Sequence, residues 1–354
     1  MRKADLIERN VAHFALMFRF FCRRSFKGKP LGLLLVLLLT LFATGAGAKP
    51  YRVGIVLPGD EWASSVDGVK EGLKAQGYIE GKDIVYFLEN AKGDKKVVSE
   101  ATKKFVADKV DAVYTITNTA LKIVVEVTRP SKTPVVFGSA SGPVESGIIE
   151  GYTTPDTHVT GVTSGSIELV AKRLEILKDV LPYIKKIAVI GDIDSDSSKA
   201  AFGVAGETAA KLGLALLEIR VASKEDAIER AKRVTPKEAD AIFLAPGLHG
   251  VGALTEIAAQ AKSARIPLAV YQVEHVKKNG ALLSYGSSYY LQGKQSASLL
   301  DKVLKGIQPS KLPIERPKLY ELILNLDTAS EAGIKFSPEV LNRADELVGG
   351  ASKR

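Results

Sequence analysis

Short apolar runs alternate with amphipathic segments from residue 51 onward. In the first half, strand-like runs at 51–57, 83–87, 111–116 and 134–137 are separated by helical patterns at 63–76, 95–108 and 118–129. Val- and Ile-rich runs that alternate with helices are typical of parallel sheets built from right-handed crossovers. The pattern therefore predicts an α/β lobe.

The same pattern then begins again. Strand-like runs at 186–190, 214–220, 240–244 and 267–270 are separated by helical patterns at 196–212, 224–234 and 252–264. The two series match step by step; ADKVDAVYTIT of the first half, for example, corresponds to PKEADAIFLAP of the second. Such a duplication predicts two doubly wound, Rossmann-like lobes, each with a parallel sheet.

A third section follows the two series and is expected to complete the two sheets. Its pattern predicts a strand at 281–286, a helix at 289–306 and a strand at 319–326. The chain is expected to cross between the lobes three times, near 161–165, 284–287 and 325–328, which forms a three-crossing hinge. The predicted lobes are residues 49–162 plus 286–325, and residues 163–285 plus 326–350.

The N-terminal part has a different pattern. Residues 33–43 form an uncharged apolar run, shorter than the roughly 20 residues that a membrane-spanning helix needs. Basic residues precede the run and Ala46-Gly47-Ala48 follows it. This order predicts a secretory signal peptide over residues 1–48, cleaved after Ala48, and a product in the periplasm of a Gram-negative cell. An uncut anchor, a start at Met17 and a twin-arginine export route remain alternatives.

Charge, cysteine content and motifs exclude several classes of protein. Residues 1–48 carry +6 of the net charge of +9, so the remaining chain carries only +3. A surface so close to neutral gives no electrostatic reason to expect binding of nucleic acid. The only cysteine, Cys22, precedes the cleavage site, so no disulfide or thiol nucleophile remains. The sequence has no HExxH, no Gly-x-Ser-x-Gly elbow and no GxGxxG after the first strand. We therefore expect a monomeric, non-enzymatic protein with no cofactor and no metal.

The loops that follow the strands are the expected binding site, because open α/β sheets bind ligands outside the carboxyl ends of their strands. These loops are rich in hydroxyls, amides and glycine, and they lead into helix N-termini, which favour an anionic group such as a carboxylate. The predicted ligand-binding residues are Trp62, Asn118, Thr119, Ser139, Ser141, Thr163, Asp192, Asp194, Pro246, Tyr271, Gln272 and Tyr285. The alternative for the polar residues is a turn or capping role, and for the aromatic residues ordinary packing.

The stretch GDIDSDSS, residues 191–198, has aspartates at alternate positions. It resembles the start of a calcium loop, but Ser197 stands where that loop needs glycine and Gly203 where it needs glutamate. A metal site is therefore not expected. We expect residues 196–198 to cap the helix at 198–212, and Asp192 and Asp194 to meet a positively charged group such as a ligand ammonium.

Five longer segments carry a resemblance to a known family. They are GPVESGIIEGYTTPDTHVTGVTS (142–164), LEILKDVLPYIKKIAVIGD (174–192), RIPLAVYQVEHVKKNGALLSYGSSYYLQGKQSASLLDKVLKG (265–306), LPIERPKLYELILNLDTASEAGI (312–334) and FSPEVLNRADELV (336–348). Together they resemble the ABC-transporter substrate-binding proteins of the tryptophan/tyrosine-type group, which have the type I periplasmic-binding fold. The resemblance implies a solute receptor that closes over a small ligand and docks on a membrane permease.

Two cleft loops depart from the family pattern. Gly142-Pro143-Val144 stands where members often have Asp-Pro-Val, and GDIDSDSS stands where they often have Asn-Pro followed by Asn-Ser. The ligand therefore stays open between an amino acid, which could be aromatic, and another small organic solute. Presentation of the ligand to a membrane sensor kinase remains the alternative to transport.

Overall fold

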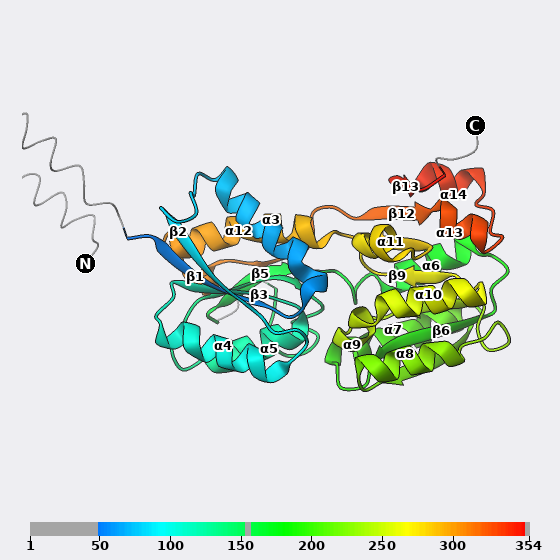
Figure 1. Ribbon diagram of the computed structural model, residues 1–354, viewed down its shortest axis with the longest axis horizontal. Helices are drawn as coiled ribbons and strands as arrows, with labels where there is room; N and C mark the ends of the chain where they lie inside the picture. The colour runs from blue at the N-terminus through cyan, green and yellow to red at the C-terminus, as the bar shows by residue number, and fades with distance from the viewer. Residues whose placement is uncertain (1–48, 153–156, 351–354) are drawn as a thin grey trace, which may run out of the picture. The chain divides into compact units, whose positions relative to one another are not determined.

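The computed structural model describes residues 49–152 and 157–350. The predicted signal peptide, residues 1–48, lies outside this range. Pro50 begins a compact unit, which contains two β-sheets with helices on both faces of each (Figure 1). No helix within the described ranges is long and apolar enough to cross a membrane.

The first sheet has six strands in the order β11-β5-β4-β3-β1-β2, and all neighbours are parallel. The strands are β1 (Tyr51–Leu57), β2 (Ile84–Asn90), β3 (Ala112–Ile116), β4 (Val135–Ala140), β5 (Val159–Thr163) and β11 (Ile314–Glu315). Helices α3 (Ala63–Ala75) and α12 (Tyr289–Leu304) cover one face of this sheet, and α4 (Lys95–Ala107) and α5 (Asn118–Thr128) cover the other. Two short 3-10 turns, η1 (Asp60–Trp62) and η2 (Pro309–Lys311), flank these elements.

The second sheet has seven strands in the order β13-β12-β10-β9-β8-β6-β7. The strands are β6 (Lys186–Asp192), β7 (Ala215–Val221), β8 (Ala241–Leu244), β9 (Leu268–Val270), β10 (Leu283–Gly286), β12 (Glu321–Asn325) and β13 (Glu346–Val348). The helices are α6 (Val170–Val180), α7 (Asp196–Lys211), α8 (Lys224–Arg233), α9 (Leu248–Gly252), α10 (Leu254–Ala264), α11 (Val273–Asn279), α13 (Leu326–Glu331) and α14 (Pro338–Arg343). Helices α8, α10 and α11 pack on one face, while α6 and α7 pack on the other.

The two sheets share one topology. The order β5-β4-β3-β1-β2 in the first sheet corresponds to β10-β9-β8-β6-β7 in the second. This confirms the predicted α/β fold with two parallel-sheet lobes. In both sheets the chain leaves the central strand first to one side and then to the other, so a crevice opens between β1 and β3 and between β6 and β8.

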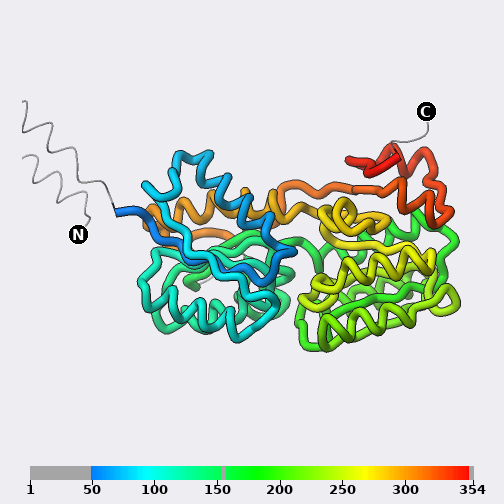
Figure 2. Tube along the Cα trace, in the orientation of Figure 1, coloured from blue at the N-terminus to red at the C-terminus, as the bar shows by residue number. Residues whose placement is uncertain are grey.

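The chain passes between the sheets in three segments (Figure 2). The first lies between β5 and α6, the second between β10 and α12, and the third between β11 and β12. The expected boundary near 325–328 is therefore wrong, because the chain leaves the first sheet after Glu315. The strand at 321–325 pairs antiparallel with β10, in the second sheet. An apolar run of this kind can add to either sheet, so the hydrophobic pattern could not decide between them, and the sequence-based prediction placed the strand in the wrong lobe.

The three crossings meet at one place. The rings of Tyr285, in β10 just before the second crossing, and Tyr320, from the third crossing, have centroids 6.3 Å apart. Gly165, in the first crossing, has a left-handed backbone with φ of +63°, and a Cβ there would lie 2.7 Å from the Tyr320 hydroxyl. A side chain at Gly165 would therefore separate two crossings that now touch.

Helices α3 and α12 approach each other through glycines. A Cβ at Gly68 would lie 2.1 Å from the carbonyl oxygen of Tyr290, and one at Gly293 would lie 2.1 Å from that of Ser65. These atoms belong to backbone, which cannot move aside as a flexible side chain can. The close contact fixes α12, which follows the second crossing, onto the first lobe.

We predict that Gly68→Ala lowers the free energy of unfolding by about 1–3 kcal/mol, because the added methyl overpacks the α3–α12 contact. Gly206→Ala on α7 is the matched control, since nothing lies within 4 Å of its Cβ position. That control is expected to raise stability by about 0.4–1 kcal/mol. Urea unfolding of both variants measures the effect, and equal midpoints would contradict the close-packing argument.

Candidate functional site

A pocket lies where the carboxyl-end loops of both sheets meet. Its lining comes from the loops after β1, β3 and β4 of the first lobe, from the loops after β6, β8 and β9 of the second, and from the start of α12. The lining residues are Trp62, Thr117, Asn118, Thr119, Ser139, Ser141, Ser195, Ser197, Pro246, Gly247, Leu248, Tyr271 and Tyr289. None of these side chains carries a formal charge, so hydroxyls, amides and aromatic rings set the chemistry of the pocket.

The two walls of the pocket touch each other. Ser197 Oγ, from the second lobe, donates to the carbonyl of Ser141 in the first at 2.8 Å. Near it, Lys122 Nζ lies 3.2 Å from Asp196 Oδ2. The enclosed space is about 20 Å³, enough for about one water molecule. Typical small-molecule pockets measure about 300–1,000 Å³, so a ligand of amino-acid size requires the lobes to separate.

The first-lobe wall presents the N-terminus of α5. Thr117 caps this helix and has φ of +70°, and Ser139, at the end of β4, has φ of +59°. Such backbone conformations are costly for residues other than glycine and concentrate at functional sites. The amides of Asn118 and Thr119 begin the helix and precede its first internal hydrogen bond. Two N–H donors and the positive end of a helix therefore face the pocket.

Asn118 adds a buried acceptor to this wall. Its side chain is 8% exposed, and Nδ2 donates to Ser146 Oγ at 2.6 Å. Its Oδ1 has no hydrogen-bond partner among the described residues. A buried polar atom without a partner is destabilising, and a ligand donor would remove that cost.

Three aromatic residues, Trp62, Tyr271 and Tyr289, form the aromatic wall of the pocket. Trp62 is 3% exposed, and its ring centroid lies 6.5 Å from that of Tyr289. His275 packs between Tyr271 and Tyr289, with its ring centroid 5.8 Å from each. Burial lowers the pKa of His275 to about 3, so its imidazole is neutral at physiological pH. Burial also raises the pKa of Tyr271, which keeps its hydroxyl protonated.

The structure divides the predicted binding residues into two groups. Those that line the pocket are Trp62, Asn118, Thr119, Ser139, Ser141, Pro246 and Tyr271. Five do not line it. Thr163 is buried at the end of β5, Gln272 is fully buried at the start of α11, and half-buried Tyr285 faces Tyr320 instead. The other two are Asp192, the last residue of β6, and Asp194, in the loop that follows it.

Asp192 has a structural partner in place of a ligand. Its carboxylate accepts from the backbone amides of His249 at 2.9 Å and of Gly250 at 3.1 Å, in the first turn of α9. Both oxygens are engaged in this way, and Asp192 is only 3% exposed. The structure therefore gives this carboxylate to α9 and not to the pocket, against the expected contact with a ligand ammonium. Asp194 is exposed and outside the pocket lining.

The rest of GDIDSDSS begins α7. Ser195 caps the helix by accepting from the amide of Ser198, and the helix starts at Asp196, two residues earlier than expected. Ser198 Oγ instead donates to the carbonyl of Pro246 at 2.6 Å. Within the described ranges, no group of three or more His, Cys, Asp or Glu side chains could hold a metal ion.

Sequence reasoning did not select six of the lining residues. Five of them, Thr117, Ser195, Ser197, Gly247 and Leu248, belong to loops that the strand pattern had placed at the cleft. Tyr289 is different, because it lies in the first turn of a helix that the sequence assigned to scaffold. No signal in the sequence separates it from its half-buried neighbours Ser288 and Tyr290.

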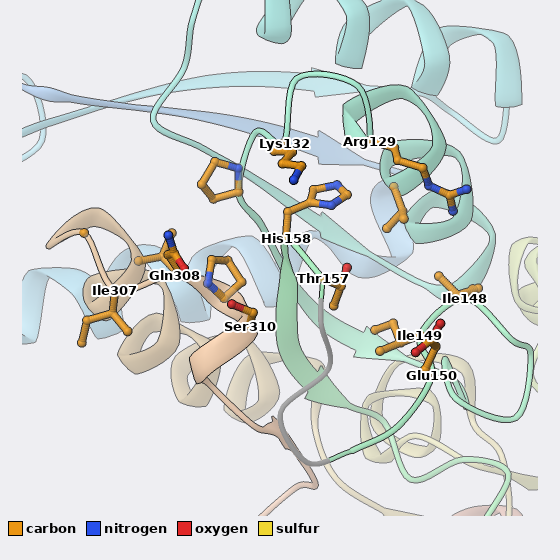
Figure 3. A pocket seen from close by; sticks show the side chains of 15 residues that line it. Arg129, Lys132, Ile148, Ile149, Glu150, Thr157, His158, Ile307, Gln308 and Ser310 are labelled. Atoms are coloured by element: carbon orange, nitrogen blue, oxygen red, sulfur yellow. The ribbon is translucent and has the colours of Figure 1, made fainter.

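A larger cavity of about 630 Å³ lies elsewhere in the first lobe, at the amino ends of β4 and β5 (Figure 3). Figure 3 shows Arg129, Lys132 and His158 along one side of it and Ile307 on another. None of the predicted binding residues lines it. Burial, followed by the charges of Arg129 and Lys132, lowers the pKa of His158. The cavity lies at the edge of the sheet opposite the carboxyl ends of the strands, and this position argues against a role of the cavity as the main ligand site.

Two sheets of one topology with a shared pocket at their carboxyl edges define a two-lobed solute receptor. The chain belongs to the family described as ABC transporter substrate binding protein, whose sequence signature matches residues 52–348. It is therefore a substrate-binding protein of an ABC transporter, and members of this family are not enzymes. The resemblance found in the sequence is confirmed.

Several known proteins are similar to this chain. A tyrosine-binding protein of Clostridioides difficile is 26% identical over 268 residues, which cover 75% of this chain and 76% of that protein. A conserved domain protein of Vibrio cholerae has a TM-score of 0.80 and 25% identity, covering 84% of this chain and all (100%) of that one. An ABC domain from Streptococcus pneumoniae in complex with L-Trp has a TM-score of 0.78 and 21% identity, covering 85% of this chain and 100% of that one.

We predict that Asp192→Ala lowers the free energy of unfolding by about 2–3 kcal/mol, because two amides of α9 lose a charged, buried acceptor. Asp194→Ala is the control and should change stability by no more than about 0.5 kcal/mol, as expected for an exposed side chain. Chemical unfolding of the two variants checks the difference. An equal, small effect of both would show that Asp192 is not an anchor for α9.

A second prediction concerns Glu274, in α11 behind Tyr289. Burial raises the pKa of this carboxyl above its usual value of 4.5. The folded state therefore binds the proton more tightly than the unfolded state, so this group's contribution to stability falls as pH rises from about 4.5 through the raised pKa. Glu274→Gln removes that term. Unfolding free energies measured across pH should show the variant gaining on the wild type as pH rises through this window, and parallel curves would contradict it.

Proposed function

We propose that the protein is an exported receptor that captures a small aromatic amino acid between its lobes and delivers it to a membrane permease. The observation that carries the proposal is the pocket itself, whose lining combines the N-terminus of α5 and several hydroxyls with the aromatic rings of Trp62, Tyr271 and Tyr289. A molecule with a carboxylate at one end and a ring at the other fits both. The relatives that bind tyrosine and L-Trp support this class of ligand.

In this proposal the carboxylate of the ligand lies at the N-terminus of α5. The amides of Asn118 and Thr119 donate to it, and the helix dipole favours its charge. The ring lies against Trp62, Tyr271 and Tyr289. Neutral acceptors, among them Asn118 Oδ1, meet the ammonium, because the carboxylate of Asp192 is already engaged.

Closure of the lobes would follow from these contacts. The residues that line the pocket come from both lobes, so a ligand that touches residues of each lobe stabilises the closed form more than the open form. The three crossings would absorb the motion as a hinge. Closure would then present a surface from both lobes to the permease. Export would depend on residues 1–48, with cleavage after Ala48 and release into the periplasm of a Gram-negative cell.

The test is calorimetric titration of the purified protein with L-tyrosine, L-tryptophan and 4-hydroxyphenylpropionate, which keeps the carboxylate and lacks the ammonium. We expect saturable binding of the amino acids and a rise in melting temperature. Trp62 is the only tryptophan, so its emission should change when L-tyrosine binds. If no aromatic acid binds while a sugar or polyol does, this proposed ligand class is wrong.

Asn118→Asp tests the place of the ligand carboxylate. The new carboxylate suits the first turn of α5 but loses the hydrogen bond that Asn118 Nδ2 donates to Ser146 Oγ, so the free energy of unfolding should fall by about 1 kcal/mol. The new carboxylate repels a ligand carboxylate at that place, so affinity for L-tyrosine should fall about tenfold or more, a change of about 1.4 kcal/mol. Tyramine, which lacks the carboxylate, is the control ligand, and its binding should not weaken. Equal loss for both ligands would place the carboxylate elsewhere.

A further inference from the structure

Two charged side chains of the second lobe, fully buried Arg173 and half-buried Glu274, hold the backbone on either side of the second crossing. Arg173, in α6, is fully buried, and its Nε donates to the carbonyl of Tyr285 at 2.6 Å. Glu274, in α11, accepts from the amide of Tyr289 at 2.6 Å through Oε1. Tyr285 precedes the crossing and Tyr289 follows it. A cation thus holds one end of this short segment and an anion holds the other.

Arg173 also links this crossing to its neighbours. Its Nη1 donates to the carbonyl of Ser166, in the first crossing, at 2.6 Å. Its Nη2 donates to the carbonyl of Tyr271, after β9, at 3.4 Å. The planar guanidinium therefore connects three separate stretches of chain through fixed directions, which a lysine ammonium cannot reproduce.

The backbone held in this way carries the aromatic wall of the pocket. Tyr271 and Tyr289 both line the pocket, and their hydroxyls lie 3.5 Å apart. Tyr271 follows a strand of the second lobe, whereas Tyr289 begins α12, which packs on the first lobe. The second crossing must therefore keep a fixed path for these two rings to stay together.

The crossing leaves no room to adjust locally. A Cβ at Gly286 would lie 2.1 Å from the carbonyl oxygen of Tyr271, so the two backbones are already in contact. Neither Arg173 nor Glu274 forms a salt bridge with another described residue. Their hydrogen bonds go to backbone, and bonds from charged groups are roughly twice as strong as neutral ones.

We propose that Arg173 and Glu274 are positioning residues for the binding pocket, which hold Tyr271 and Tyr289 in one arrangement by fixing the second crossing between them. They do not touch the ligand. They set where the aromatic wall stands relative to the first lobe, and so link ligand contact to the path of the hinge. This inference rests on the proposed function only for the identity of the ligand.

The experiment combines ligand-free tryptophan emission with titration of L-tyrosine. Trp62 is the only tryptophan and lies 6.5 Å from Tyr289 between ring centroids, so its emission and its quenching by acrylamide report the aromatic wall. In Arg173→Met and Glu274→Met we expect emission to shift, quenching to rise and affinity for L-tyrosine to fall about tenfold, within the usual range of coupling between sites. Glu274→Gln keeps the acceptor and should retain the wild-type emission and affinity.

Lys178→Met is the matched control for Arg173→Met. Lys178 lies on the same helix and donates to the carbonyls of Pro182 at 3.0 Å and Ile184 at 2.7 Å, away from the pocket lining. Its loss should lower stability and leave emission and affinity unchanged. If Arg173→Met and Glu274→Met behave like this control, the proposal is overturned.

Two further arms keep the outcome decisive. If Arg173→Met does not fold, the Glu274→Met and Glu274→Gln pair tests the proposal alone, since the two variants differ in the acceptor for Tyr289. If wild-type protein binds neither L-tyrosine nor L-tryptophan, the proposed function fails, while the ligand-free emission of Trp62 still tests the positioning role.

Discussion

Parallel strand pairing at the centre of each sheet is the constraint on which the pocket depends. β1 pairs parallel with β3, and β6 pairs parallel with β8. Their carboxyl ends therefore meet at one edge, and the chain leaves them toward opposite faces of the sheet. Duplication of this arrangement gives two such edges, and the loops that line the pocket all begin there or lie beside them. The N-terminus of α5 faces the same place for the same reason.

The edges hold their shape through buried polar contacts. Asp192 accepts from two amides in the first turn of α9, and Ser198 donates to the carbonyl of Pro246. The stretch GDIDSDSS, residues 191–198, therefore holds neighbouring loops of the second lobe in place. Buried charges of this kind are stable only when hydrogen bonds satisfy them. The consequence for function is a pocket with neutral lining, where helix termini and hydroxyls replace ion pairs.

Two polar contacts join the two lobes at the pocket, and both are weak. Lys122 and Asp196 form an exposed pair, with side chains 52% and 39% exposed, and such pairs contribute about 0–1 kcal/mol. A neutral hydrogen bond between Ser197 and Ser141 adds about as much. These two contacts therefore stabilise the closed arrangement only slightly, and a ligand that bridges both lobes can shift the balance between open and closed forms.

The sequence by itself determined the two-lobed α/β fold, because apolar runs and amphipathic segments depend on local periodicity, and the duplication makes the pattern visible twice. It also identified the loops of the pocket, since strand ends follow from the strands. It placed the strand at 321–325 in the wrong sheet and assigned Asp192 to a ligand. Only the tertiary structure decided these points, and it alone brought Tyr289, Arg173 and Glu274 to the pocket and its hinge. Strand partners and hydrogen bonds between distant segments depend on which surfaces meet, and local periodicity carries no record of that.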